Sequence, residues 1–144
     1  MAIVDSYLQM LAGPQRRALM ELLAWLSAID GDVSFEEVMF IGETAKQLGV
    51  HSNAAELLEA VTKKGLAPVC ACFDQPNVKA IALVQIIGIA FADGTYHDAE
   101  RRGVRAIAEA MGVAEAKVGR LEDWVEQGLA WEAAGRHLMA LSSD

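Results

Sequence analysis

The chain has 144 residues, of which 53% are hydrophobic, and it carries a formal net charge of -8. This size indicates one domain over residues 1–144, long enough to bury about two thirds of the surface that the unfolded chain exposes. The acidic balance argues against nucleic-acid binding, because neutralising phosphates requires clustered Lys and Arg, and here the basic residues stand in small separated groups.

Apolar residues recur with a helical period along almost the whole chain, and no stretch alternates with the period of a strand. We therefore predict an all-α fold, a single-domain bundle of about seven to eight helices. The most apolar segment, at 76–92, should be the most buried helix because it is apolar almost all round. In chain order, the helices are expected at about 2–12, 14–29, 34–48, 52–64, 76–92, 97–111, 114–128 and 131–141.

An acidic turn, IDGDVSFEEV at residues 29–38, joins the second and third predicted helices. Ser34 and Glu37 have the spacing of a capping box, in which each side chain binds the backbone N–H of the other residue. The segment between Arg17 and Lys46 contains no basic residue to neutralise its acids. Crowded carboxylates raise each other's pKa values, and a bound cation would relieve that repulsion. The acids of this segment are Glu21, Asp30, Asp32, Glu36, Glu37 and Glu43.

The acidic turn recurs later in the chain, where DGTYHDAERRGVRAIAEAMGV at 93–113 aligns with DGDVSFEEVMFIGETAKQLGV at 30–50. The identities fall mainly on acids and on turn and cap positions, with Ala45 over Ala108 and Val50 over Val113, although His97 replaces the capping serine. The aligned acids are Asp30 with Asp93 and Glu37 with Glu100.

This recurrence predicts two pseudo-symmetric helical repeats, at about 15–64 and 76–128. The expected last helix, at about 131–141, places Trp131, Ala134, Leu138 and Leu141 on one stripe, which suits a lid over the core. We expect Trp124 and Trp131 to pack the end of the chain onto the bundle, since aromatic burial usually dominates core energetics. The alternative is that they anchor a partner.

The repeated acids suggest a cation site, because carboxylates with hydroxyl or carbonyl oxygens suit Ca²⁺, Mg²⁺ or Mn²⁺. The turn is not an EF-hand, since position 12 counted from Asp30 is Ile41. We expect the first turn to bind more readily than the second, in which Arg101, Arg102 and Arg105 can pair with Asp98. The candidate metal ligands are Asp30, Asp32, Glu37, Asp93 and Glu100.

Both segments resemble the acidic element of the TerB-like family, named for the bacterial tellurite-resistance protein TerB. The shared feature is a helix ending in an Asp-Gly turn, followed by a helix with Glu near its start. The resemblance covers roughly residues 15–128, and the chain departs from the family pattern at His97. It implies a helical bundle of two related halves and a non-enzymatic role. The acidic positions that the resemblance marks are Asp30, Glu37, Asp93 and Glu100, with Asp32 and Glu36 as neighbours.

By that resemblance these positions form a divalent-cation site or an acidic interaction surface for a protein partner. The resemblance also implies a link to tellurite or other chemical stress, and peripheral association with the membrane through partners. The alternative function is a metal-independent interaction module that docks a basic partner through its acidic face.

Other features of the sequence fit a soluble, cytoplasmic, non-enzymatic protein. No nucleophile elbow, phosphate-binding loop or dinucleotide fingerprint is present. The N-terminus has Asp5 and no basic region of a secretory signal. The apolar run at 80–92 is shorter than the roughly 20 residues that span a bilayer. Cys70 and Cys72 are expected to be free thiols in a reducing compartment.

Overall fold

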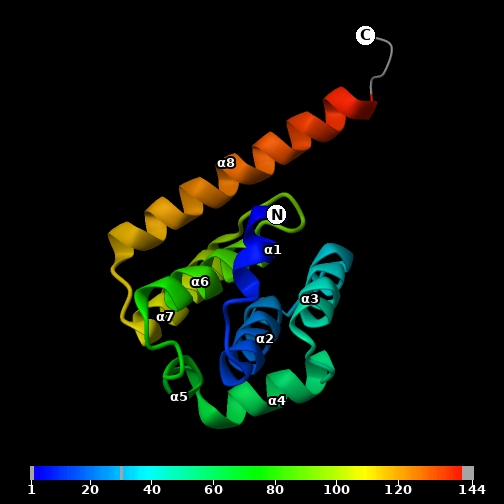
Figure 1. Cartoon of the computed structure of the whole chain (residues 1–144). Helices are drawn as coiled ribbons and strands as arrows, with labels where there is room; N and C mark the ends of the chain where they lie inside the picture. The colour runs from blue at the N-terminus through cyan, green and yellow to red at the C-terminus, as the bar shows by residue number, and fades with distance from the viewer. Residues whose placement is uncertain (1, 30, 141–144) are drawn as a thin grey trace.

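The computed structural model describes residues 2–29 and 31–140, and within these ranges it contains helices and no strand (Figure 1). The predicted all-α bundle is confirmed. Its helices in chain order are α1 (Ala2–Leu8), α2 (Gly13–Ser27), α3 (Phe35–Leu48), α4 (Ala54–Lys64), α5 (Leu66–Cys70), α6 (Pro76–Ala90), α7 (Asp98–Met111) and α8 (Glu115–Ala140).

The helix boundaries differ from the prediction in three places. Helix α1 ends at Leu8 rather than at about residue 12. The chain around Pro68 forms the short helix α5, because proline is tolerated in the first turn of a helix, where its missing N–H has no partner to lose. The two helices expected at 114–128 and 131–141 are one 26-residue helix, α8. Gly128 does not break it, since an internal glycine costs a helix only about 1 kcal/mol.

Helices α2 and α6 form the centre of the bundle. Helix α2 contacts α3, α4, α5, α6 and α7, and α6 contacts α1, α2, α3, α7 and α8. Every residue of α6 from Ile81 to Ile87 is buried, which confirms the prediction that this segment is the most buried. Cys70 is also buried, and burial raises the pKa of its thiol to about 11. Both cysteines are free, as expected.

Two glycines allow helices to approach closely within this core. A Cβ atom on Gly103 of α7 would lie 2.6 Å from the Leu26 side chain of α2. A Cβ atom on Gly88 of α6 would lie 3.1 Å from the Phe40 ring of α3. Since real Cβ atoms rarely come this near to other heavy atoms, these helix pairs depend on the missing side chains.

The two acidic turns share their local backbone structure. Gly31 and Gly94 both adopt positive φ, at 76° and 88°. Helices α3 and α7 each have 14 residues, follow an extended N-cap residue and end at a left-handed glycine. After each glycine, a valine N–H binds the carbonyl oxygen five residues back: Val50 to Ala45, and Val113 to Ala108. The two segments therefore fold alike locally, while their pseudo-twofold relation stays a prediction.

Helix α8 is anchored to the bundle mainly by its first half and by Leu129, which packs against the core just after the middle of the helix. Its buried residues are Val118, Glu122 and Val125, and it contacts α6 and α7. Figure 1 shows its second half extending past the other helices. The prediction that residues 131–141 form a lid over the core is therefore wrong, because the straight helix α8 carries its described second half past the end of the bundle.

The exposed side chains of the second half agree with this arrangement. The exposed fractions of Trp131, Leu138 and Met139 are 78%, 74% and 83%. Trp124 is 41% exposed. The expectation that both tryptophans pack into the core is therefore wrong. Leu141, the last residue of the predicted stripe, lies outside the described residues.

Candidate functional site

The first acidic turn is held by its capping box. The Ser34 hydroxyl accepts a hydrogen bond from the Glu37 N–H at 3.1 Å, and the Glu37 carboxylate accepts one from the Ser34 N–H at 3.2 Å. The predicted box is thus confirmed. Glu37 is only 6% exposed, while Asp32 and Glu36 are exposed. Asp30 lies outside the described residues.

The second acidic turn uses a different local contact. The Asp93 carboxylate accepts a hydrogen bond from the Thr95 N–H at 3.0 Å and lies 3.4 Å from Nε2 of His97. His97 is the N-cap residue of α7, and its side chain makes no capping hydrogen bond, as the substitution for serine predicted. Glu100 is 4% exposed, so it is buried at the start of its helix, as Glu37 is.

The predicted metal ligands therefore divide into buried and exposed groups. Glu37 and Glu100 are buried, whereas Asp32 and Asp93 are exposed. Within residues 2–29 and 31–140, no three His, Cys, Asp or Glu side chains gather in a way that could hold a metal ion. Because Asp30 lies outside those ranges, the cation site stays a prediction.

Glu21 does not belong to an uncompensated acidic segment, and that prediction is wrong. Its carboxylate is 1% exposed and accepts hydrogen bonds from Nζ of Lys64 at 2.9 Å and Nε of Arg17 at 3.2 Å. Lys64 ends α4, far away in sequence, and the packing of α4 along α2 brings it to Glu21. A cation is therefore not needed to balance this buried charge.

The arginines of the second repeat pair with α8 rather than within their own helix. The Arg105 guanidinium donates two hydrogen bonds to the Glu122 carboxylate, at 2.8 and 2.9 Å, and Arg101 donates a longer one at 3.4 Å. The Tyr96 hydroxyl donates to the same carboxylate at 2.6 Å. Instead of the predicted pairing with Asp98, Arg101 and Arg105 of α7, together with Tyr96 of the second turn, form hydrogen bonds to Glu122 of α8.

In this cluster of Tyr96, Arg101, Arg105 and Glu122, here called the Glu122 cluster, the neighbours of Glu122 favour its ionised form. Burial opposes ionisation of Glu122, but the hydrogen bonds from Arg105 and Tyr96 outweigh it and lower the pKa of the carboxyl group. Burial and the neighbouring carboxylate raise the pKa of Tyr96. The Arg101 guanidinium also lies 4.2 Å above the Tyr96 ring, a favourable cation–π geometry.

A large groove lies between α3, α6, the second turn and α8. Its volume is about 710 Å³. Among the described residues that line it, the acids come from three separate segments of the chain and Arg136 is the one basic residue. We call it the acidic groove. Its carboxylates belong to Asp5, Glu36, Glu43 and Glu126, and its large apolar side chains to Met39, Phe40, Phe91 and Leu129.

The sequence reasoning missed this groove because its walls come from distant segments. One signal was present: Glu36 and Glu43 stand seven residues apart on α3, which places them on one face of the helix. Glu126, Leu129 and Arg136 follow similar spacings on α8 and share a face of that helix. The sequence does not reveal that these two faces meet.

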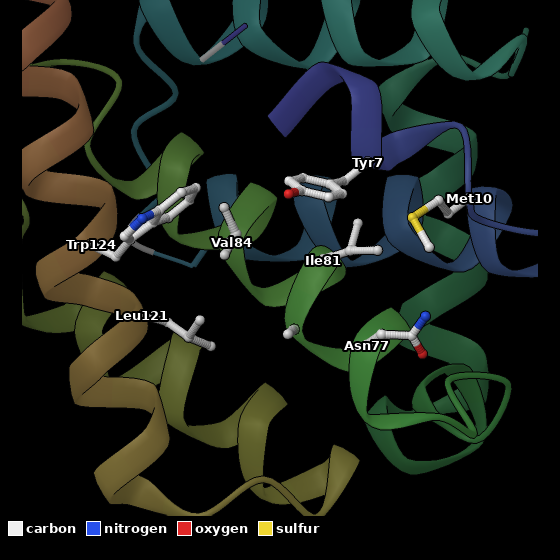
Figure 2. A pocket seen from close by; sticks show the side chains of 8 residues that line it. Tyr7, Met10, Asn77, Ile81, Val84, Leu121 and Trp124 are labelled. Atoms are coloured by element: carbon white, nitrogen blue, oxygen red, sulfur yellow. The ribbon is translucent and has the colours of Figure 1, made fainter. Parts of the chain in front are cut away.

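A second, smaller cavity of about 320 Å³ is almost entirely apolar and lies between α1, α6 and α8. Figure 2 shows Tyr7 of α1 and Trp124 of α8 on either side of Val84. Leu121 and Ile81 line the cavity below them. Trp124 thus contributes one side to this cavity while remaining partly accessible at the surface.

Comparisons of the chain with protein-family models, with curated proteins and with solved structures find no match. Membership of the TerB-like family therefore stays a prediction from the two acidic turns. None of the helices in the described part of the chain combines the length and hydropathy that crossing a membrane requires.

Proposed function

We propose that this chain is a non-enzymatic interaction module whose acidic groove binds a basic, amphipathic helix of a protein partner. The observation that carries the proposal is that large apolar side chains and carboxylates together line a groove of about 710 Å³. A helix laid into a groove places its apolar face on the floor and its charged residues against the rim.

The apolar side chains that line the groove would supply most of the affinity. Phe40, Phe91 and Leu129 line the groove, and all three are only partly buried. Met39, also in the groove, is 50% exposed. Covering apolar surface of this kind stabilises a complex by roughly 25 cal/mol per Å² before the costs of association.

The carboxylates would select the sign of the partner's charge. Glu36 and Glu43 of α3 and Glu126 of α8 are all exposed residues. Lys or Arg side chains on the bound helix would meet these charges, and an acidic helix would be repelled. The resemblance to TerB-like proteins also implies an acidic interaction surface, although among the described residues Glu36 is the one acidic position marked by the resemblance that lines this groove. A cytoplasmic location and a link to chemical stress belong to the same proposal.

The test uses a synthetic amphipathic helix with one Leu face and one Lys face, labelled for fluorescence anisotropy. A second helix, with Glu in place of every Lys, is measured in the same way. Exchanging Glu36→Gln/Glu43→Gln should weaken binding of the Lys helix about threefold to tenfold, since exposed charge pairs contribute about 0.2–1 kcal/mol each. The control, Glu59→Gln/Glu109→Gln, removes two exposed carboxylates outside the groove and should leave the affinity unchanged. Equal binding of the Lys and Glu helices would refute the proposal.

A further inference from the structure

The exposed face of α8 carries a regular apolar stripe that the acidic groove does not use. Trp124, Trp131 and Leu138 stand seven residues apart, with Gln127 and Ala134 between them. This alternation of three and four residues is the spacing of a coiled-coil seam. At about 100° per residue, the stripe lies on the opposite side of α8 from Glu126, Leu129 and Arg136, which face the groove.

Beyond Leu129, which packs against the core, the second half of α8 has few contacts that hold it helical. Val125 is the last buried residue of the described helix. Gly128 and Gly135 follow it, and each costs a helix about 1 kcal/mol relative to alanine. Short helices without tertiary contacts are marginal in water. A partner on the apolar stripe would supply the missing contacts and cover Trp131 and Leu138, which are the kind of exposed apolar surface that marks an interaction site.

We propose that this stripe pairs with the same stripe of a second copy of the chain, antiparallel, across a twofold axis at Trp131. The ends of the stripe are symmetric about that residue, while Gln127 lies four residues before it and Ala134 three residues after it. Trp124 and Leu138 lie at equal distances on either side of it, so each would contact the other in the partner. Trp131 would contact its own copy, and Gln127 would lie beside Ala134.

The flanks of the stripe match in the same register. Asp123 precedes Trp124, and His137 precedes Leu138, so the two lie on one flank at similar distances from the axis. A carboxylate and an imidazole therefore meet at each end of the pair. On the other flank, Gly128 meets Gly135, and the absence of side chains there lets the two helices approach closely.

A second helix could reach the stripe, because Trp131 and Leu138 are exposed over most of their surface. The first half of α8 contacts α6 and α7 on its buried side. Trp124 also lines the small apolar cavity, so Leu138 of the partner subunit would extend the covered apolar surface toward that cavity. The paired length, from Trp124 to Leu138, is about 21 Å at 1.5 Å per residue.

The paired segment has 15 residues, fewer than the roughly 20–30 residues that each partner contributes to a standard stable complex. We therefore expect a dimer that dissociates in the micromolar range. Sedimentation velocity over a wide range of concentrations should show the monomer at low concentration and the dimer at high concentration. Trp131→Glu should remove the dimer, because it places two carboxylates together on the axis. Ala116→Glu adds the same charge to α8 outside the paired length and should leave the dimer intact.

Because Trp131 is 78% exposed, its substitution should leave the fold unchanged, which circular dichroism verifies. The antiparallel register has its own test, in a Cys72→Ser background. A mixture of the Gln127→Cys and Ala134→Cys variants, oxidised with glutathione disulfide, should form a mixed disulfide, and neither variant alone should do so.

Three results would overturn the proposal. The wild type could stay monomeric at every concentration, the Trp131→Glu variant could dimerise as well as the wild type, or each cysteine variant could link only to itself. A monomer that co-sediments with phosphatidylglycerol vesicles would assign the stripe to a lipid surface instead.

Discussion

The Glu122 cluster should account for a measurable part of the stability of the fold, because it is the main polar link between α8 and the bundle. The Glu122 side chain is 8% exposed and accepts hydrogen bonds from Tyr96, Arg101 and Arg105. Breaking a fully buried ion pair costs about 3–5 kcal/mol. The guanidinium groups left behind here would still be partly hydrated, since Arg105 and Arg101 are 31% and 45% exposed.

That hydration lowers the expected cost toward the value of hydrogen bonds to charged groups, about 1.5–3 kcal/mol. Glu122→Gln keeps the volume of the side chain and one acceptor oxygen, so we expect a loss of about 2 kcal/mol. For a chain of this size the melting temperature changes by about 3 °C per kcal/mol. Thermal unfolding followed by circular dichroism at pH 7 should therefore show a decrease of about 6 °C.

Glu115 provides the matched control. Its carboxylate lies 3.6 Å from Nε of the same Arg105 but is 83% exposed, and exposed ion pairs contribute little. Glu115→Gln should unfold within about 0.5 kcal/mol of the wild type. If Glu122→Gln were as stable as the wild type, or if the two variants lost equal stability, the reasoning about burial would be refuted.

The pKa of Glu122 gives the same cluster a pH signature. Its folded pKa lies below the ordinary value, so the ionised form stabilises the folded state above the ordinary pKa, about 4.3. This contribution is lost as the pH falls through the lowered folded pKa. The difference in melting temperature between the wild type and Glu122→Gln should therefore be constant near neutral pH and shrink below about pH 4. A difference that grows on acidification would contradict the assignment.

Two further predictions concern helix packing and the cation site. Gly103→Ala should destabilise the fold by about 1–3 kcal/mol in urea unfolding, because the new methyl group would collide with the Leu26 side chain. Gly119→Ala is the control: it lies in open space on α8 and should be neutral or stabilising. Equal effects of the two substitutions would refute the close-packing argument. The cation hypothesis expects millimolar Ca²⁺, Mg²⁺ or Mn²⁺ to raise the melting temperature of the wild type, with a dissociation constant of roughly 10⁻⁴–10⁻³ M. The melting temperature of Asp30→Asn/Glu37→Gln should not change with these ions. If the wild type responds to none of the three ions, the hypothesis is refuted.

The sequence predicted best what depends on neighbouring residues. The Ser34–Glu37 capping box and the left-handed glycines that end α3 and α7 are confirmed, because caps are formed by residues within a few positions of one another. The burial of α6 also follows from its own composition, since a segment that is apolar on every side has no face to leave in water.

Pairs between distant residues could not be predicted in the same way. Lys64 reaches Glu21, and Arg105 reaches Glu122, only after helices far apart in sequence have packed. Reading charge along the chain therefore overestimated the uncompensated acids near the first turn. The stripe on α8 shows a related limit. The sequence identified an apolar face correctly, but periodicity does not say whether the bundle or another molecule covers that face.

The two proposed surfaces of α8 lie on opposite faces of the helix, and this has a testable consequence. A dimer through the Trp131 stripe would leave both acidic grooves open and carry two of them in one particle. Two Lys helices joined by a flexible linker long enough to span the grooves should then bind the wild type more tightly than one helix, since linkage can increase avidity by about 10²–10⁴-fold. In Trp131→Glu the gain should disappear while the single helix binds as before. A gain that persists in this variant would mean that the grooves act without the dimer.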